Sequence, residues 1–199
     1  MKKSLAPVLL LFFFSINSFS QNEYLRAPAI GVSFFFNDFT TPQRIRASSL
    51  NNVLRNHQWA EFREMNAGIA LSYFTGIHRN IDFAGSIGAS FVRMPLKDPV
   101  NPEEESILLE GDASFQFKML PENYVFTPYL LAGAGISRYK SSYGAFLPLG
   151  GGFKVNIFDE ASIFLQAQYR IPLTHETNNY HFVTSLGISG VVGKKKYKS

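Results

Sequence analysis

The chain has 199 residues, a formal net charge of +4 and no cysteine. The lack of cysteine excludes disulfides, thiol catalysis and thiolate metal sites. The charge is too small and too scattered to favour nucleic-acid binding. Phenylalanine (20) and tyrosine (9) greatly outnumber tryptophan (1), which is typical of a strand-rich protein. The composition therefore predicts a β-rich chain of ordinary domain size, without nucleic-acid partners.

Residues 1–20 have the pattern of a signal peptide. Two lysines precede the apolar run 5–14, and small serines follow it. That run is shorter than the ~20 apolar residues of a membrane-spanning helix. We therefore predict cleavage between Ser20 and Gln21, handling by the export machinery, and one mature domain at 21–199.

Alternation of apolar and polar residues predicts the secondary structure of the mature chain, because successive side chains of a β-strand point to opposite faces. The predicted strands, in chain order, cover residues 30–37, 66–78, 81–94, 107–119, 126–137, 144–157, 162–173 and 182–192. Helix-forming residues lie in the polar segment 38–65, and a basic tail, 194–199, ends the chain. The pattern predicts an all-β protein with a short helix in its first loop.

The segment 144–173 gives the clearest evidence of a membrane protein. Two strands joined by a tight turn present one continuous apolar face, and the opposite face mixes glycines, amides and charges. Each strand has the length of a tilted transmembrane strand. We interpret the apolar face as facing lipid and the polar face as lining the interior of a barrel.

The connections between the strands alternate in length. The joins after the second, fourth and sixth strands are short turns, and the other joins are generally longer and more polar. This alternation is typical of an eight-stranded antiparallel up-and-down outer-membrane barrel with both termini on the periplasmic side. A secreted lipocalin-like barrel would invert the two faces. Strand length, and the glycine, alanine and serine on the polar face, favour the membrane barrel.

Four segments carry a resemblance to a known family. They are FTPYLLAGAG at 126–135, GAFLPLGGG at 144–152, NIFDEA at 156–161 and QYRIP at 168–172. The mature chain resembles the amino-terminal β-barrel of OmpA-like outer-membrane proteins. The resemblance implies an integral outer-membrane protein of the Gram-negative envelope, usually structural, in contact with lipid and lipopolysaccharide and inserted by the barrel-assembly machinery. The periplasmic peptidoglycan-binding domain of many relatives is not expected, because the sequence stops at Ser199.

Six charged residues fall on the predicted interior face. They are Asp82, Glu110, Asp112, Lys118, Lys154 and Arg170. Eight strands leave an interior just wide enough for side chains, and opposite charges neutralise each other when buried. We predict a structural ion network that fills the barrel. A gated ion path and a buried catalytic group are the alternatives.

The long first loop, 38–65, is the best candidate for a specific role. Its possible binding surface comprises Arg44, Arg46, Arg55, Trp59 and Arg63. Arginine can grip phosphate groups, so this loop is a candidate for binding lipopolysaccharide or another partner. The alternative is a short helix over 47–62 that covers the barrel mouth, with Leu50, Val53, Leu54 and Phe62 on one side.

The sequence contains no convincing catalytic or cofactor motif. The glycine-rich runs at 133–135 and 150–152 lie inside strands, without a following helix to bind phosphate. His175 and His181 are expected in a polar loop, six residues apart, whereas zinc proteases place two histidines four apart on a helix. We therefore expect a monomeric, non-enzymatic, structural barrel that displays its loops, without cofactor or metal. Adhesion or partner binding through 38–65, or a narrow porin-like channel, are the alternatives.

Overall fold

The computed structural model describes residues 23–92, 106–121, 124–140, 142–157, 160–174, 180–192 and 197–198. The predicted signal peptide and its cleavage site at Ser20 and Gln21 lie outside these ranges. None of the helices within them is long and apolar enough to cross a membrane.

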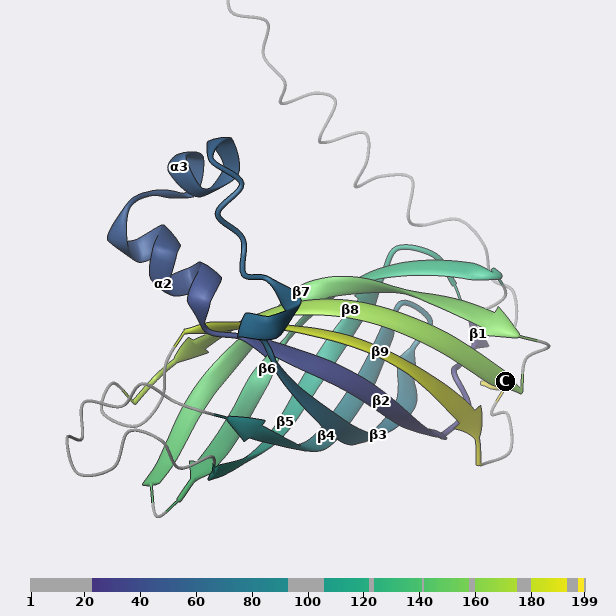
Figure 1. Ribbon diagram of the computed structural model, residues 1–199. Coiled ribbons are helices and arrows are strands. Elements are labelled where there is room, and N and C mark those ends of the chain that lie inside the picture. Colours follow the sequence, from purple (N-terminus) through teal and green to yellow (C-terminus); the bar gives the residue numbers. More distant parts are fainter. Residues whose placement is uncertain are drawn as a thin grey trace, which may run out of the picture.

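Eight antiparallel strands form a closed barrel, and each pairs with its neighbours in chain order (Figure 1). The strands are β2 (Ala29–Asp38), β3 (Asn66–His78), β4 (Ile81–Val92), β5 (Ser106–Lys118), β6 (Phe126–Tyr139), β7 (Ser142–Ile157), β8 (Ala161–Pro172) and β9 (His181–Val191). β2 pairs with β9 from Ala29↔Val191 to Asp38↔Phe182, which closes the barrel and leaves no free sheet edge. The predicted eight-stranded up-and-down barrel is confirmed.

The two faces of every strand follow the predicted alternation. On β5, Leu109, Phe115 and Phe117 are exposed on the outside, and Glu110 and Gln116 are buried inside. The same alternation continues around the barrel, because paired residues of adjacent strands share a face. The wall is therefore apolar outside, and its interior is lined by polar, aromatic and small residues.

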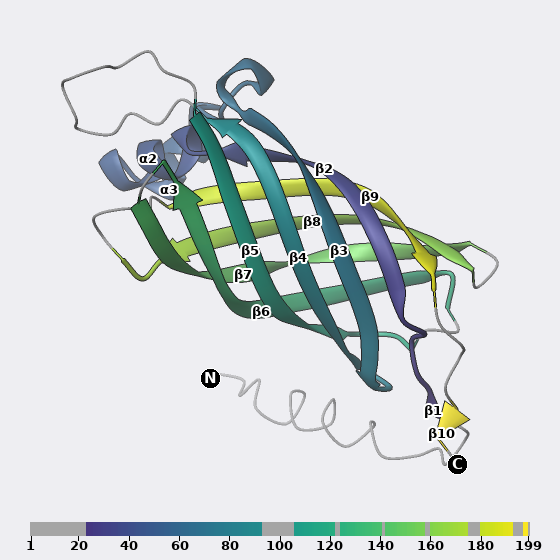
Figure 2. The same ribbon diagram turned by 90° about the horizontal axis from the view of Figure 1, so that it is seen from below.

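The barrel has two different ends. We call the end that carries residues 39–65 the loop end and the opposite end, with the joins β3–β4, β5–β6 and β7–β8, the turn end (Figure 2). A two-stranded pair of β1 (Glu23–Tyr24) and β10 (Tyr197–Lys198) lies beyond the turn end. The sequence did not predict this pair, which brings part of the basic tail beside the start of the described chain.

The helix predicted over 47–62 is wrong in its bounds. The loop contains α2 (Thr40–Ala47), α3 (Leu50–Arg55) and a 3-10 helix, η1 (Phe62–Glu64). The Ser49 side chain accepts a hydrogen bond from the Asn52 N–H and so begins a new helix. Val53 alone of the four predicted apolar residues is buried; Leu50, Leu54 and Phe62 are exposed.

The connection predicted after the fifth strand is also shorter than expected. β6 continues to Tyr139 and β7 begins at Ser142, and these two residues pair with each other. Residues that looked like a polar loop therefore extend the barrel wall at the loop end, where side chains facing water need no apolar pattern.

Candidate functional site

The loop-end part of the interior contains a cluster of four ionisable side chains from three strands. Arg170 Nη1 on β8 lies 2.6 Å from Glu110 Oε2 on β5, and Arg170 Nη2 lies 3.4 Å from Asp112 Oδ1. His181 Nε2 lies 3.4 Å from Glu110 Oε1. The Arg170 guanidinium also covers the Phe146 ring, 4.7 Å from its centroid. These contacts tie β5 to β8 and β9 across the interior.

A second cluster surrounds Asp82 near the turn end. Its Oδ1 lies 2.6 Å from Lys118 Nζ, and its Oδ2 lies 3.6 Å from Arg26 Nη1 and 4.0 Å from Lys154 Nζ. All four side chains are buried. Arg26 also stacks on the Phe74 ring, at 4.2 Å. The six charged residues predicted for the interior therefore form two separate clusters, one near each end.

A small cavity lies beside the loop-end cluster. The described residues enclose a cavity of about 20 Å³, lined by small and polar side chains including Ser33, Ser86 and Gln168. A single water needs roughly 10–15 Å³ on this measure. The Tyr129 hydroxyl donates to Gln166 Oε1 across the same region, at 3.0 Å. Glu110, Asp112 and Arg170 of the loop-end cluster also line this cavity.

The loop 39–65 is attached to the barrel mouth by specific contacts. The Phe39 ring packs on the His181 ring, with centroids 4.5 Å apart, and on the buried group of Val92, Leu108 and Tyr139. Asp38 Oδ1 accepts a hydrogen bond from the Thr41 N–H at 2.8 Å, and the Thr41 hydroxyl accepts one from the Ala60 N–H at 2.9 Å. These contacts hold α2 at the barrel mouth, next to the loop-end cluster. We call the whole loop 39–65 the lid.

The five residues of the predicted binding surface have different surroundings. Arg44 donates to the carbonyls of Gln58 and Trp59 and pairs with Glu64 at 2.8 Å. Arg46 stacks on the Tyr180 ring at 4.4 Å, and Arg63 pairs with Glu61 at 3.0 Å. Arg55 and Trp59 are exposed. These residues are thus spread over the lid, and the contacts of Arg44 hold parts of the lid together.

Glu64 completes the base of the lid. Its carboxylate accepts a hydrogen bond from the Glu61 backbone N–H at 2.9 Å as well as the Arg44 contact. The hydrogen bond from the Glu61 N–H has the largest effect, and together with the Arg44 guanidinium it outweighs desolvation and lowers the pKa of Glu64 below its usual value. This capping contact fixes η1 immediately before β3 begins.

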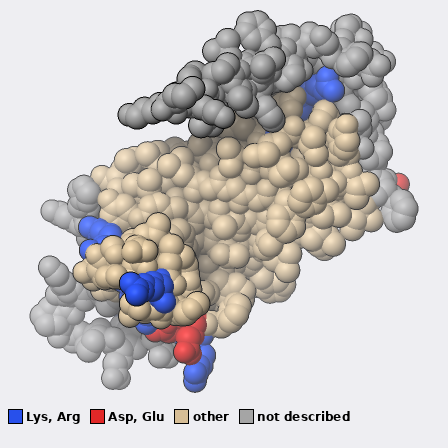
Figure 3. All heavy atoms as spheres, turned by 90° about the horizontal axis from the view of Figure 1, so that it is seen from above, with Lys and Arg blue, Asp and Glu red and all other residues tan. Residues whose placement is uncertain are grey.

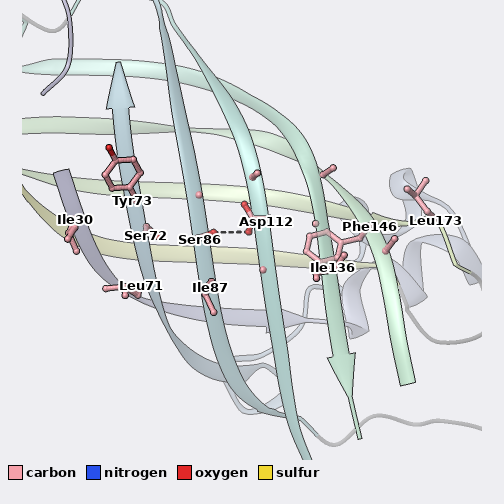
Figure 4. A pocket seen from close by; sticks show the side chains of 16 residues that line it. Ile30, Leu71, Ser72, Tyr73, Ser86, Ile87, Asp112, Ile136, Phe146 and Leu173 are labelled. Atoms are coloured by element: carbon pink, nitrogen blue, oxygen red, sulfur yellow. Dashed lines mark hydrogen bonds between the residues drawn. The ribbon is translucent and has the colours of Figure 1, made fainter. Parts of the chain in front are cut away.

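The outer wall carries almost no charge. Among the described strands β2–β9, Arg138 near the loop end of β6 is the only Asp, Glu, Lys or Arg that faces outward. In Figure 3 the charged atoms of the visible face lie toward its ends, and the wall between them is uncharged. Outward side chains such as Ile30, Leu71 and Ile87 line an apolar pocket (Figure 4). On the inner face of the same part of the wall, the Ser86 hydroxyl donates to Asp112. An uncharged apolar wall is suited to lipid.

Sequence reasoning missed two members of the clusters. His181, expected in a polar loop, begins β9 and is fully buried. His181 lies two residues before Val183, which faces the interior together with Ser185. Extending the alternation by two residues would therefore have placed His181 inside. Arg26 lies before Pro28, outside the regular strand β2, and no periodicity could place it inside. Within the described part of the chain, no group of three His, Asp or Glu side chains could hold a metal ion.

This closed antiparallel barrel, with an apolar wall and a polar interior, has the architecture of small outer-membrane barrels. Neisserial surface protein A matches with 12% identity and a TM-score of 0.52, over 82% of this chain and 95% of that one. At this identity the match shows the fold, and it confirms the predicted resemblance to OmpA-like barrels at that level.

Two further solved barrels are similar with lower scores. The amino-terminal barrel domain of Pseudomonas aeruginosa OprF matches with 13% identity and a TM-score of 0.48, over 85% of this chain and 98% of that domain. Ail, the attachment invasion locus protein of Yersinia pestis, matches with 14% identity and a TM-score of 0.48, over 84% of this chain and 97% of that one. No family model and no curated protein matches the sequence.

Proposed function

We propose that the chain is an integral outer-membrane protein with a structural, non-enzymatic role and an interior filled by its own side chains. One observation carries the proposal: buried ion pairs join strands on different sides of an apolar-walled barrel. Arg170 on β8 reaches Glu110 on β5, and Lys154 on β7 approaches Asp82 on β4. Eight strands leave an interior just wide enough for side chains, so ion pairs that reach across it obstruct a path through the barrel.

The proposed orientation places the turn end and both termini in the periplasm and the loop end outside the cell. The short turns and the longer first loop support this orientation. Export and barrel-assembly factors would deliver the chain, and lipid and lipopolysaccharide would surround its wall. The lid of α2 and α3 is then the part that the protein displays.

Two measurements test this proposal together. The folded protein in outer-membrane fractions should change its mobility on a gel only after boiling, because a closed barrel resists detergent until heated. Purified protein in planar bilayers should give no steady conductance steps. Steps that change in size when Glu110 is replaced by Gln would instead support the narrow channel. Recovery in the soluble periplasmic fraction, without a heat shift, would support the lipocalin-like alternative.

Partner binding through the lid is a second candidate function. It is favoured by the half-exposed apolar side chains of Leu50 and Leu54 beside Arg55 on α3. Replacing Leu50 and Leu54 by Ser should abolish attachment of cells to a surface or partner while leaving the heat shift of the barrel unchanged. Unchanged attachment in this variant would remove α3 from the binding surface.

A further inference from the structure

An aromatic group marks the loop end of the outer wall. Tyr169 on β8 faces outward, with its ring 4.9 Å from Phe182 and 5.9 Å from Tyr180. Arg46 of α2 covers the Tyr180 ring from the side of the lid. Aromatic rings with arginine at their outer side are typical of the level at which a membrane protein passes from acyl chains to headgroups.

Phe36 extends this group onto β2. It belongs to the outward series of Ile30, Val32 and Phe34, and it pairs with Thr184 of β9 and Ala67 of β3. It is less exposed than Phe34, because the Phe62 ring of the lid packs against it edge to face, with centroids 6.0 Å apart and planes at 78°. The lid therefore adds a ring to the apolar wall from outside the barrel.

Phe62 itself is poorly covered by protein. It is 79% exposed, the largest value among the exposed large apolar side chains of the described residues. The neighbouring Glu61–Glu64 capping box and the Arg44–Glu64 pair hold η1 in place, so the ring is presented by a fixed backbone. A rigidly held phenylalanine ring in water costs free energy that burial in an apolar phase would recover.

We infer that Phe62 inserts into the outer leaflet beside Phe36 and fastens the lid to the lipid surface. The inference rests on the membrane position proposed above. Its support is continuity: the Phe62 ring touches the wall that faces lipid, at the level of the aromatic group. The residues around it, Glu61, Arg63 and Glu64, are charged, so they fit the headgroup layer and do not form the apolar patch that a protein partner would need.

The single tryptophan of the chain allows a direct test. Trp59→Phe removes the native fluorophore, and one tryptophan is then placed at position 62, 34 or 50. Phe62→Trp reports on the proposed anchor, and Phe34→Trp reports on the wall of the same strand as Phe36. Leu50→Trp reports on α3, which lies on the side of α2 away from the barrel (Figure 1). Each protein is reconstituted into phosphatidylcholine vesicles whose acyl chains carry bromine, a contact quencher of tryptophan.

The inference predicts that the Phe62→Trp protein loses emission to an extent similar to that of the Phe34→Trp protein, with a blue-shifted maximum. The Leu50→Trp protein should keep its emission. Quenching at position 34 without quenching at position 62 would overturn the anchor and leave the membrane position intact. Absence of quenching at both positions would overturn the membrane position and, with it, the anchor. The heat shift on a gel verifies that each protein is folded.

Discussion

The Arg170 guanidinium lies 2.6 Å from the Glu110 carboxylate, although β8 and β5 are not neighbours in the barrel. β6 and β7 stand between them, so this ion pair crosses the interior. Asp112 and His181 complete the same cluster, and the lid rests on His181 through Phe39. The charges of this interior cluster are thus connected, through His181 and Phe39, to the loop at the barrel mouth.

Removing the guanidinium should strongly destabilise the barrel. Arg170→Met keeps most of the side-chain volume but leaves Glu110 and Asp112 buried without their cation, and breaking a buried pair in this way costs about 3–5 kcal/mol. The free energy of unfolding, from urea titration in detergent micelles followed by the gel heat shift, should fall by that order. The triple variant E110Q/D112N/R170M removes all three charges and should recover much of the loss. Equal losses in both variants would contradict a role for the charge pairing.

Interior and exterior glycines should respond differently to a methyl group. An added Cβ at Gly150 would meet the Ala167 carbonyl oxygen and would lie 2.8 Å from Gln168 Cα, so Gly150→Ala forces the β7–β8 backbones apart. Overpacking of this kind costs roughly 1–3 kcal/mol. At outward Gly85 the nearest atom would be 3.6 Å away, on the Phe83 ring. Gly85→Ala should leave the urea midpoint unchanged, and a matching loss there would refute this account of the packing.

The lid should loosen when Thr41 loses its hydroxyl. Thr41→Val keeps the shape of this buried side chain but removes the acceptor of the Ala60 N–H. Leaving that N–H unpaired costs about 1–3 kcal/mol, confined to the lid. Hydrogen exchange at the Ala60 amide should become faster, and the heat shift of the barrel should not change. Ser48→Ala, which removes an exposed hydroxyl hydrogen bond, is the control and should leave the exchange at Ala60 unaltered.

Lowering the pH should loosen the lid by protonating Glu64. Because the folded loop lowers the pKa of Glu64, its ionised carboxylate stabilises the loop above the usual glutamate value of about 4.3. That stability is lost as the pH falls through the lower, folded-state pKa. Arg44 joins Glu64 to the Trp59 carbonyl, so Trp59 emission should change across this acid window. In Glu64→Gln this part of the pH dependence should disappear; an unchanged curve would exclude Glu64 as its source.

The faces of the strands could be read from the sequence with few errors. A period of two sets which side chains share a face, and a one-residue error would reverse the whole strand. The alternation therefore placed Asp82, Glu110, Asp112, Lys118, Lys154 and Arg170 inside, where the structure has them. The same alternation, extended to His181, would have placed this residue inside as well. It was missed because a polar histidine beside a polar segment does not show where the strand begins.

Contacts between distant segments were decided only by the tertiary structure. Strand periodicity gives the face of Glu110 but not its partner, because barrel closure and strand tilt determine which interior side chains meet. Arg26 joins the Asp82 cluster from irregular backbone, and Phe62 meets Phe36 from a loop whose two helices follow local capping at Ser49. The sequence by itself determined a membrane-type barrel wall, since that depends on local alternation. The ion clusters, the lid and its exposed ring depended on how the closed barrel brings remote residues together.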